Sequence, residues 1–229
     1  MFNLQINGLQ SYMWRWLAEI AICRHFSIFA TTMEKSELLE LSRQMRRSAL
    51  EMLDHLNIEK SCHHVGGTMN VVGSLKTDLM LNHRDVDLHI YTGEPIIEKS
   101  FSFMNKVAEN EAVKDIQYKN LLDTKEECIE WHLWCEGKDK SIWKFDIIHI
   151  RKGSFYDGFF EKVTDRIIEK LKPETKEAIL QIKYELGGKS AVQGIQVYHA
   201  VLGHGIKNYE DFIQWSKENP VNTVLDWIP

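Results

Sequence analysis

The chain has 229 residues and a formal net charge of −5, with 44% hydrophobic and 27% charged residues. This is the composition of an ordinary globular protein with enough apolar material for a sizeable core. The negative balance argues against a protein that coats duplex DNA through a broad basic surface, but it allows a small anionic ligand in a local site.

The four cysteines form no C-x-x-C pair, so we interpret them as reduced thiols of a cytoplasmic protein. The only local cluster of zinc-binding residue types is Cys62-His63-His64. We expect a strand there, and neighbours on a strand point to opposite faces, which disfavours zinc. No apolar run is long enough to span a bilayer. Residues 1–32 are interpreted either as an extension from an upstream start codon or as an amphipathic helix.

Apolar residues recur at helical spacing from residue 34 to about residue 57 and predict a long amphipathic helix. The glycine-bounded segment 62–74 predicts one or two short strands, and residues 75–84 a turn or short helix. Alternation of polar and apolar residues over 85–91 predicts a further strand. Residues 96–110 are expected to be helical.

Two more strands are predicted over residues 127–136 and 141–150, and the short polar loop between them indicates an antiparallel hairpin. From residue 156 onwards the pattern is helical. Pro173 suits the first position of the second helix of this region, which ends at Gly187-Gly188, and Ser190 is expected to cap the third. The sequence therefore predicts an α+β fold, in which a mixed β-sheet with flanking helices is followed by a C-terminal helical segment.

Two aspartates stand two residues apart in the strand predicted over residues 85–91. Because successive side chains of a strand point to opposite faces, Asp85 and Asp87 share one face. Two like charges so close repel each other, and a divalent cation between them relieves the repulsion. Magnesium prefers carboxylates together with the phosphate oxygens of a substrate. The pair therefore predicts a magnesium site.

A third aspartate, Asp146, lies in the middle of the apolar strand 141–150, where a lone carboxylate is costly unless it is paired or coordinated. If this strand lies beside residues 85–91, the three carboxylates converge. Two metal ions held there activate an acceptor oxygen and stabilise a leaving pyrophosphate.

A glycine-serine turn precedes the acidic strand. Gly73 lets the backbone approach a phosphate closely, and exposed N–H groups with the Ser74 hydroxyl can bind its oxygens. Lys76 adds positive charge nearby. Lys183 and Tyr184 on a later helix are weaker candidates for contact with a triphosphate or base, and we expect them on a solvated helix face. His149 alternates to the face opposite Asp146 and is expected to be packed.

The Gly73-Ser74 turn, the spacer 75–84 and the strand Asp85-Val86-Asp87-Leu88 resemble the signature of the DNA polymerase beta-type nucleotidyltransferase superfamily, in its small-molecule or minimal branch. Asp146 matches the third acidic residue of that signature. Many members follow the Gly-Ser pair with Ala-Arg-Gly, whereas Leu75-Lys76-Thr77 stands here. This departure weakens placement among the commonest bacterial subgroups and leaves the metal residues untouched.

The resemblance implies a nucleotidyltransferase-like domain over residues 33–155 and a helical region over 156–229. It further implies a nucleoside triphosphate, ATP or another, as donor and Mg²⁺ as cofactor. The metal and catalytic residues are then Asp85, Asp87 and Asp146, and the nucleotide-binding residues are Gly73, Ser74 and Lys76.

Two further functional hypotheses stand beside nucleotidyl transfer. A non-catalytic nucleotide- or partner-binding module of antitoxin type is disfavoured, because a pure binder has no need of three converging carboxylates. A metal-binding hydrolase is also disfavoured, because the sequence lacks the pattern of histidine ligands that such an enzyme needs. The net charge makes long nucleic acid the least favoured acceptor, so we expect a small molecule.

Overall fold

The structure is a computed structural model that describes residues 33–94, 96–187, 192–220 and 227–229. Its contacts divide the chain into two units, residues 1–34 and residues 35–229, and the description below concerns the second. The expectations for residues 1–32 and for Ser190 lie outside the described residues. The domain boundary after residue 155 stays a prediction. No helix in the described part is long and apolar enough to cross a membrane.

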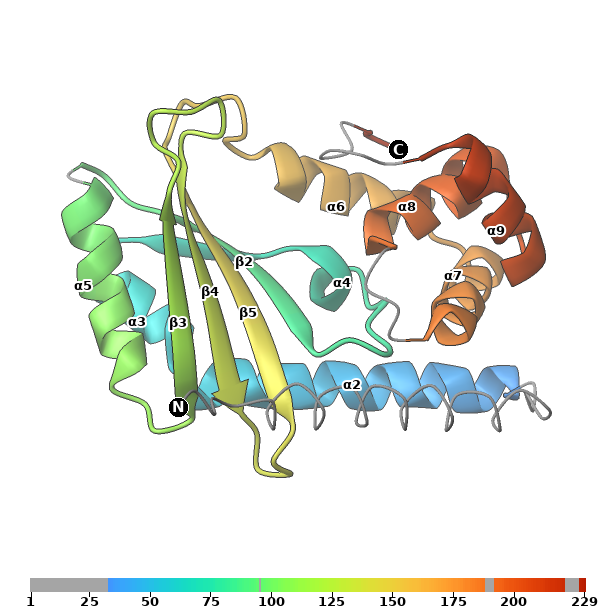
Figure 1. Cartoon of the computed structure of the whole chain (residues 1–229), viewed down its shortest axis with the longest axis horizontal. Helices are drawn as coiled ribbons and strands as arrows, with labels where there is room; N and C mark the ends of the chain where they lie inside the picture. Colours follow the sequence, from blue (N-terminus) through green and yellow to red (C-terminus); the bar gives the residue numbers. More distant parts are fainter. Residues whose placement is uncertain (1–32, 95, 188–191, 221–226) are drawn as a thin grey trace, which may run out of the picture. The chain divides into compact units, whose positions relative to one another are not determined.

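A mixed sheet forms the centre of the unit, with strand order β1-β2-β5-β4-β3 within the described residues. The neighbours β2 and β5 run parallel, and every other adjacent pair is antiparallel. Figure 1 shows β3, β4 and β5 side by side, with β2 crossing behind them. The strands are β1 (Thr68–Val71), β2 (Asp85–Tyr91), β3 (Val113–Asn120), β4 (Cys128–Glu136) and β5 (Ile142–Ile150).

One face of the sheet is packed against three helices, α2 (Lys35–His55), α3 (Ile58–His64) and α5 (Ile96–Ala108). Alternate strand residues such as Val86, Leu88 and Phe145 are fully buried there with Phe103 of α5. This burial of apolar area is the main contribution to stability.

The remaining helices come from the segment between β1 and β2 and from the C-terminal region. They are α4 (Gly73–Lys76), α6 (Phe159–Lys170), α7 (Pro173–Leu186), α8 (Gly194–Tyr198), the π-helical turn η1 (His199–Gly203) and α9 (Tyr209–Glu218). As predicted, Pro173 opens α7 and Gly187 follows its last residue, with a positive φ of 60°.

One sequence-based expectation about secondary structure was wrong, and one strand was not predicted. Cys62, His63 and His64 end helix α3 and do not lie on a strand; Ile58, Ser61 and Cys62 are buried at helical spacing. The strand β3 was missed because its sequence, VKDIQYKN, is mostly polar and lies at the edge of the sheet. Val113 and Ile116 are partly buried against the core, but a register shift between Val113 and Asp115 interrupts the alternation that marks a strand.

The hairpin tryptophans were expected in the core, and Trp131 and Trp143 are buried at 4% and 3% exposure. Trp131 Nε1 also donates a 2.8 Å hydrogen bond to Ser100 Oγ of α5. Trp134 differs, because it is half-buried on the opposite face, 6.4 Å from the ring of His132.

Helix α6 is anchored to the sheet by a largely enclosed carboxylate. Glu161 Oε1 accepts hydrogen bonds from Tyr91 Oη at 2.8 Å and Asn70 Nδ2 at 3.1 Å, and lies 3.1 Å from His89 Nδ1. Burial by itself raises the pKa of Glu161, but the contacts with His89, Asn70 and Tyr91 outweigh it and lower the pKa to about 2. The carboxylate therefore stabilises the fold in its ionised form.

We expect Glu161→Gln to destabilise the protein by roughly 3 kcal/mol at neutral pH, because a buried hydrogen-bonded charge is lost while its partners stay. Since the folded-state pKa is depressed, this stability is present above the ordinary pKa of 4.5 and is lost as the pH falls towards 2. Thermal unfolding across this range measures it. The control is Glu169→Gln, an exposed partner of Arg166 on the same helix, and equal melting curves for the two variants would refute the anchor.

Candidate functional site

Three aspartates lie on the face of the sheet opposite the core. Asp85 and Asp87 lie on β2, and Asp146 lies directly opposite Asp87 on the parallel neighbour β5. Adjacent strands are about 4.8 Å apart, so directly opposed side chains on one face are neighbours. The three aspartates proposed from the sequence therefore share one face of the β2–β5 pair, and we call them the acidic set.

The Gly73-Ser74 turn packs directly on Asp87. The Val72 N–H donates a 3.1 Å hydrogen bond to the Asp87 carbonyl, and Gly73 adopts a φ of +63°. A Cβ atom placed on Gly73 would lie 2.1 Å from Asp87 Oδ2. Only glycine therefore allows both the left-handed backbone and this close approach. Ser74 follows at the start of α4 and lines the same cavity as the aspartates.

The electrostatics of Asp87 are those of a carboxylate without enough positive charge around it. Burial, and after it the negative charges of Asp146 and Asp85, raise the pKa of Asp87 from 3.8 to about 6. His89 and Lys144 oppose the shift and do not cancel it. A cation bound here would favour the ionised carboxylate and so lower the pKa of Asp87.

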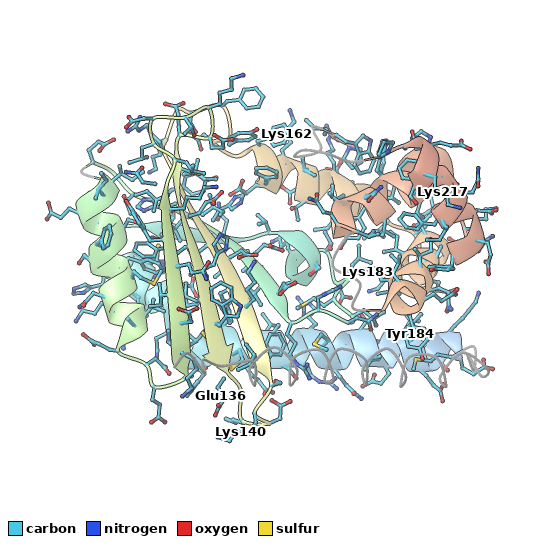
Figure 2. The ribbon with its side chains drawn as sticks, in the orientation of Figure 1. Glu136, Lys140, Lys162, Lys183, Tyr184 and Lys217 are labelled. Atoms are coloured by element: carbon cyan, nitrogen blue, oxygen red, sulfur yellow. The ribbon has the colours of Figure 1, made fainter. Side chains whose placement is uncertain are left out.

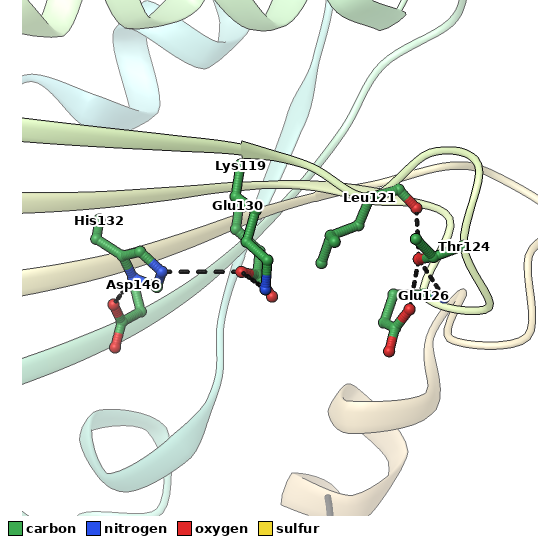
Figure 3. Close-up of polar contacts among 7 residues, drawn as sticks. All are labelled: Lys119, Leu121, Thr124, Glu126, Glu130, His132 and Asp146. Carbon is green, nitrogen blue, oxygen red and sulfur yellow. Dashed lines mark hydrogen bonds and ion pairs between the residues drawn. The ribbon is translucent and has the colours of Figure 1, made fainter.

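Asp146 has protein partners of its own. His132 Nδ1, on the neighbouring strand β4, hydrogen-bonds Asp146 Oδ1, and Lys144 Nζ lies 2.9 Å from Oδ2. His132 Nε2 lies 3.8 Å from Glu130 Oε2, which Lys119 Nζ approaches to 3.4 Å. Figure 3 shows this polar row running across the strands from Asp146 to Lys119.

His132 was missed in the sequence, although a signal for it existed. The hairpin loop closes between Glu136 and Ile142, and counting back along both strands pairs His132 with Asp146. A hairpin of known loop length fixes its register in this way.

The three aspartates of the acidic set are the candidate ligands for a metal ion. The three side chains supply only hard carboxylate oxygens, which is the chemistry that magnesium prefers. Among the described residues, however, no three carboxylate, imidazole or thiol side chains are already grouped to hold an ion. Asp146 is turned towards His132 and Lys144. Magnesium binding would therefore require Asp146 to exchange at least part of these contacts for the ion.

A cavity of about 800 Å³ extends over the acidic set. Its floor is the polar face of β2, β4 and β5, and its walls come from α4, α6, α7 and α8. This volume is that of a site for a nucleotide-sized ligand. At one end it is lined by Gly73, Ser74, Thr77, Lys183 and Tyr198.

Lys183 reaches this cavity, contrary to the solvated helix face expected from the sequence. Its Nζ donates a 2.5 Å hydrogen bond to the Leu79 carbonyl and lies 5.7 Å from the Tyr198 ring centroid. Burial lowers the pKa of Lys183 from 10.5 to about 8, against the opposite pull of Asp87 and Asp85. Figure 2 shows Lys183 on the side of α7 that faces α4. The packing of α7 beside the α4–β2 connection, which no local pattern reveals, accounts for the difference.

Other sequence candidates are placed differently. Lys76 is exposed at the end of α4 and is not among the residues that line the cavity. His149 is buried on the core face, as expected, and its Nε2 lies 2.9 Å from Thr92 Oγ1. Burial lowers the pKa of His149 to about 4, which keeps it neutral.

Comparison with known proteins places this arrangement among solved nucleotidyltransferase folds. A mutant form of Cid1 poly(U) polymerase bound to MgATP matches with a TM-score of 0.56 and 14% identity, over 75% of this chain and 55% of that one. A second Cid1 structure, described by its RNA terminal uridylyl transferase activity, matches with a TM-score of 0.54 and 14% identity, over 75% and 52%. The GLD-2–GLD-3 non-canonical poly(A) polymerase complex matches with a TM-score of 0.51 and 12% identity, over 85% and 67%.

The fold is therefore the nucleotidyltransferase-like α+β fold that the sequence predicts. The chain spans about half the length of the Cid1 structures. No protein-family model and no curated protein matches the sequence. At 12–14% identity the likeness is one of fold, and the activity has to be argued from the site.

Proposed function

We propose that this protein transfers a nucleoside monophosphate from a nucleoside triphosphate to a hydroxyl group of a small-molecule acceptor, with Mg²⁺ as cofactor. The observation that carries the proposal is the direct opposition of Asp87 and Asp146 across the parallel β2–β5 pair, beside the Gly73 turn and within one cavity. The solved structures of the same fold support it, because they are described as a poly(U) polymerase and a poly(A) polymerase, one of them bound to MgATP.

The reaction balances as a displacement at the α-phosphorus. The acceptor oxygen forms a bond to the α-phosphorus while the bond from that phosphorus to the oxygen bridging to the β-phosphate breaks. Pyrophosphate leaves with the electron pair, and the hydroxyl proton passes to the Asp146 carboxylate or to water. Magnesium, when held by Asp85, Asp87 and Asp146, neutralises phosphate charge and lowers the pKa of the acceptor oxygen.

The protein's own part in this reaction is to bind and orient. Gly73 and Ser74 offer backbone N–H groups and a hydroxyl to phosphate oxygens at the edge of the acidic set. Lys183 is the lysine at this end of the cavity, so we assign it the charge contact with the triphosphate that the sequence had suggested for Lys76. Fixed donors of this kind account for most of the catalysis expected in phosphoryl transfer.

A second candidate function is favoured by one observation. Asp146 is already paired with Lys144 and His132, as a carboxylate in a non-catalytic nucleotide-binding module would be. The two candidates differ in one measurable respect, because both bind Mg-ATP and only the enzyme releases pyrophosphate.

The test measures pyrophosphate release from each of four radiolabelled nucleoside triphosphates, with magnesium and a panel of hydroxyl-bearing small molecules and a short RNA. We expect release that depends on one acceptor class and is lost in Asp85→Asn. The control variant is Asp115→Asn, an exposed aspartate on β3. Nucleotide binding without release supports the binding module, and release that survives Asp85→Asn removes the assigned role of the acidic set.

The pKa of Lys183 makes nucleotide binding depend on pH. Because its pKa is lowered to about 8, the ammonium that attracts phosphate is lost in the nucleotide-free protein as the pH rises through 8. We expect the affinity for Mg-ATP to fall between pH 7.5 and 9.5 by roughly tenfold in the wild type. In Lys183→Met the affinity should be lower at every pH and flat across this range, as measured by calorimetry. A wild-type curve parallel to that of Lys183→Met would contradict the assignment.

A further inference from the structure

The cavity continues past the acidic set into a second end with a different character. Its floor there is Cys128 and Glu130 of β4 with Ile148 and Ile150 of β5, paired across the strands as Cys128 with Ile150 and Glu130 with Ile148. One wall is the start of α6. This end is part of the same cavity as the Gly73 turn and Lys183 and lies on the other side of Asp146.

Aromatic rings form the wall of this end. Tyr156 and Phe160 stack with their ring centroids 5.4 Å apart and their planes 15° apart, and both line the cavity. Phe160 also meets His89 edge-on at 5.6 Å, which fixes the ring next to the strand that carries Asp87. Aromatic faces attract cations as well as apolar rings.

The charges at this end are negative. Glu130 lies on the floor with 23% of its side chain exposed, and Glu126 stands exposed at the mouth, where the Thr124 hydroxyl hydrogen-bonds it. Figure 3 shows both carboxylates along β4 and the loop that precedes it. Within the part of the chain that the structure describes, Lys183 at the opposite end is the only lysine or arginine that lines the cavity.

Basic side chains near these carboxylates include Lys119, Lys125, whose charge acts on Glu126, and His132, whose Nε2 lies 3.8 Å from Glu130 Oε2. Lys119 approaches Glu130 at 3.4 Å, but 60% of its side chain is exposed. An exposed pair of this kind contributes little, so an amine of a ligand can replace the lysine at small cost. A phosphate group placed at this end would meet carboxylates and apolar side chains in place of the basic groups that bind anions.

We propose that this end, lined by Glu126, Glu130, Tyr156 and Phe160, binds the acceptor, and that the acceptor is a small molecule carrying both a positively charged amine and an apolar ring. That the molecule bound here is the acceptor rests on the proposed function. The preference for a positively charged molecule rests on the residues that line the cavity alone. The polyanionic end of an RNA is the acceptor that these charges exclude.

The test uses two fluorescent probes that differ only in charge. Dansylcadaverine carries an amine, and dansyl-aminocaproic acid carries a carboxylate on a chain of the same length. Binding of each is measured by fluorescence titration, with and without Mg²⁺ and a non-hydrolysable ATP analogue. We expect the amine probe to bind at least about tenfold more tightly than the acid probe in both conditions.

Variants locate the probe. Glu130→Gln should weaken binding of the amine probe by roughly fivefold to tenfold, and Glu126→Gln by less, because Glu126 is exposed. The control is Glu136→Gln on the same strand, which pairs with Lys140 and does not line the cavity. None of these substitutions should change the affinity for the ATP analogue.

Several outcomes overturn the inference. The first is that the acid probe binds as tightly as the amine probe or more tightly, and the second is that the amine probe does not bind at all. The third is an unchanged affinity for the amine probe in Glu130→Gln. The fourth is a short oligoadenylate that binds more tightly than the amine probe and displaces it. Loss of binding of the ATP analogue itself counts against the proposed function instead, whatever the dansyl probes do, so the two failures are distinguishable.

Discussion

We expect Asp87→Asn to abolish the proposed nucleotidyl transfer and at the same time to make the nucleotide-free protein more stable at neutral pH. The loss of activity should reach at least about 10³-fold, equivalent to about 4 kcal/mol of transition-state stabilisation, because a central metal-holding carboxylate is removed. The gain in stability follows from the raised pKa of Asp87, about 6 against an ordinary 3.8.

The sign of the stability effect is set by the direction of that shift. A carboxyl whose folded-state pKa is raised contributes stability that is fully present below pH 3.8 and is lost as the pH rises through 6. At pH 8 the wild type therefore carries a penalty that asparagine removes. Two pKa units correspond to an upper bound of about 3 kcal/mol, and allowing for partial exposure we expect about 2 kcal/mol, or roughly 5 °C in melting temperature.

The measurement is thermal unfolding of both proteins between pH 3.5 and 8, with and without magnesium and ATP. The two melting temperatures should converge below pH 3.8, diverge as the pH rises from 3.8 to 6, and differ by a constant amount above pH 6. Adding magnesium and ATP should raise the melting temperature of the wild type alone. A variant that melts below the wild type at pH 8 would show that Asp87 is a structural carboxylate.

Gly73→Ala is the second substitution with a large expected effect. An added Cβ lies 2.1 Å from Asp87 Oδ2, and alanine resists the φ of +63°. We expect a loss of at least about 2 kcal/mol in stability from backbone and clash together. Transfer should fall by about 10²-fold or more, because Asp87 is pushed out of position.

Gly66→Ala separates the two causes. Gly66 has a similar φ of +69°, and a Cβ there meets nothing within 4 Å. This control should lose only the stability that alanine costs at a positive φ, and it should keep its activity. Activity of Gly73→Ala equal to that of Gly66→Ala, measured as pyrophosphate release, would mean that the close approach to Asp87 has no role in the reaction.

Much of the fold could be predicted because its signals are local. The strand Asp85–Tyr91 and the hairpin of β4 and β5 follow from patterns that alternate with a period of two residues. The helices α6, α7 and α9 follow from helical spacing of apolar residues, and Pro173 and Gly187 mark where α7 begins and ends. The edge strand β3 could not be predicted in this way, because its sequence is mostly polar and exposed and a register shift between Val113 and Asp115 interrupts its alternation.

The acidic set was accessible from the sequence for a related reason. Strand period fixes Asp85 and Asp87 on one face, and the cost of a carboxylate inside an apolar strand marks Asp146. The partners of Asp146 depend on strand register, and the position of Lys183 in the cavity depends on how α7 packs. Both are features of the tertiary structure that local sequence patterns do not reveal. Sequence reasoning therefore chose Lys76, the nearest lysine along the chain, where the fold offers Lys183.

The central claim is that Asp85, Asp87 and Asp146 share a divalent cation with the phosphates of a bound nucleotide. Its most direct test is a crystal structure with Mn²⁺ and a non-hydrolysable ATP analogue, in which anomalous scattering locates the metal. We predict a manganese ion in contact with carboxylate oxygens of all three residues, with Asp146 turned from Lys144 towards the ion. A nucleotide bound with its metal elsewhere, or with Asp146 still paired to Lys144 and His132 and out of reach of the ion, would contradict the account.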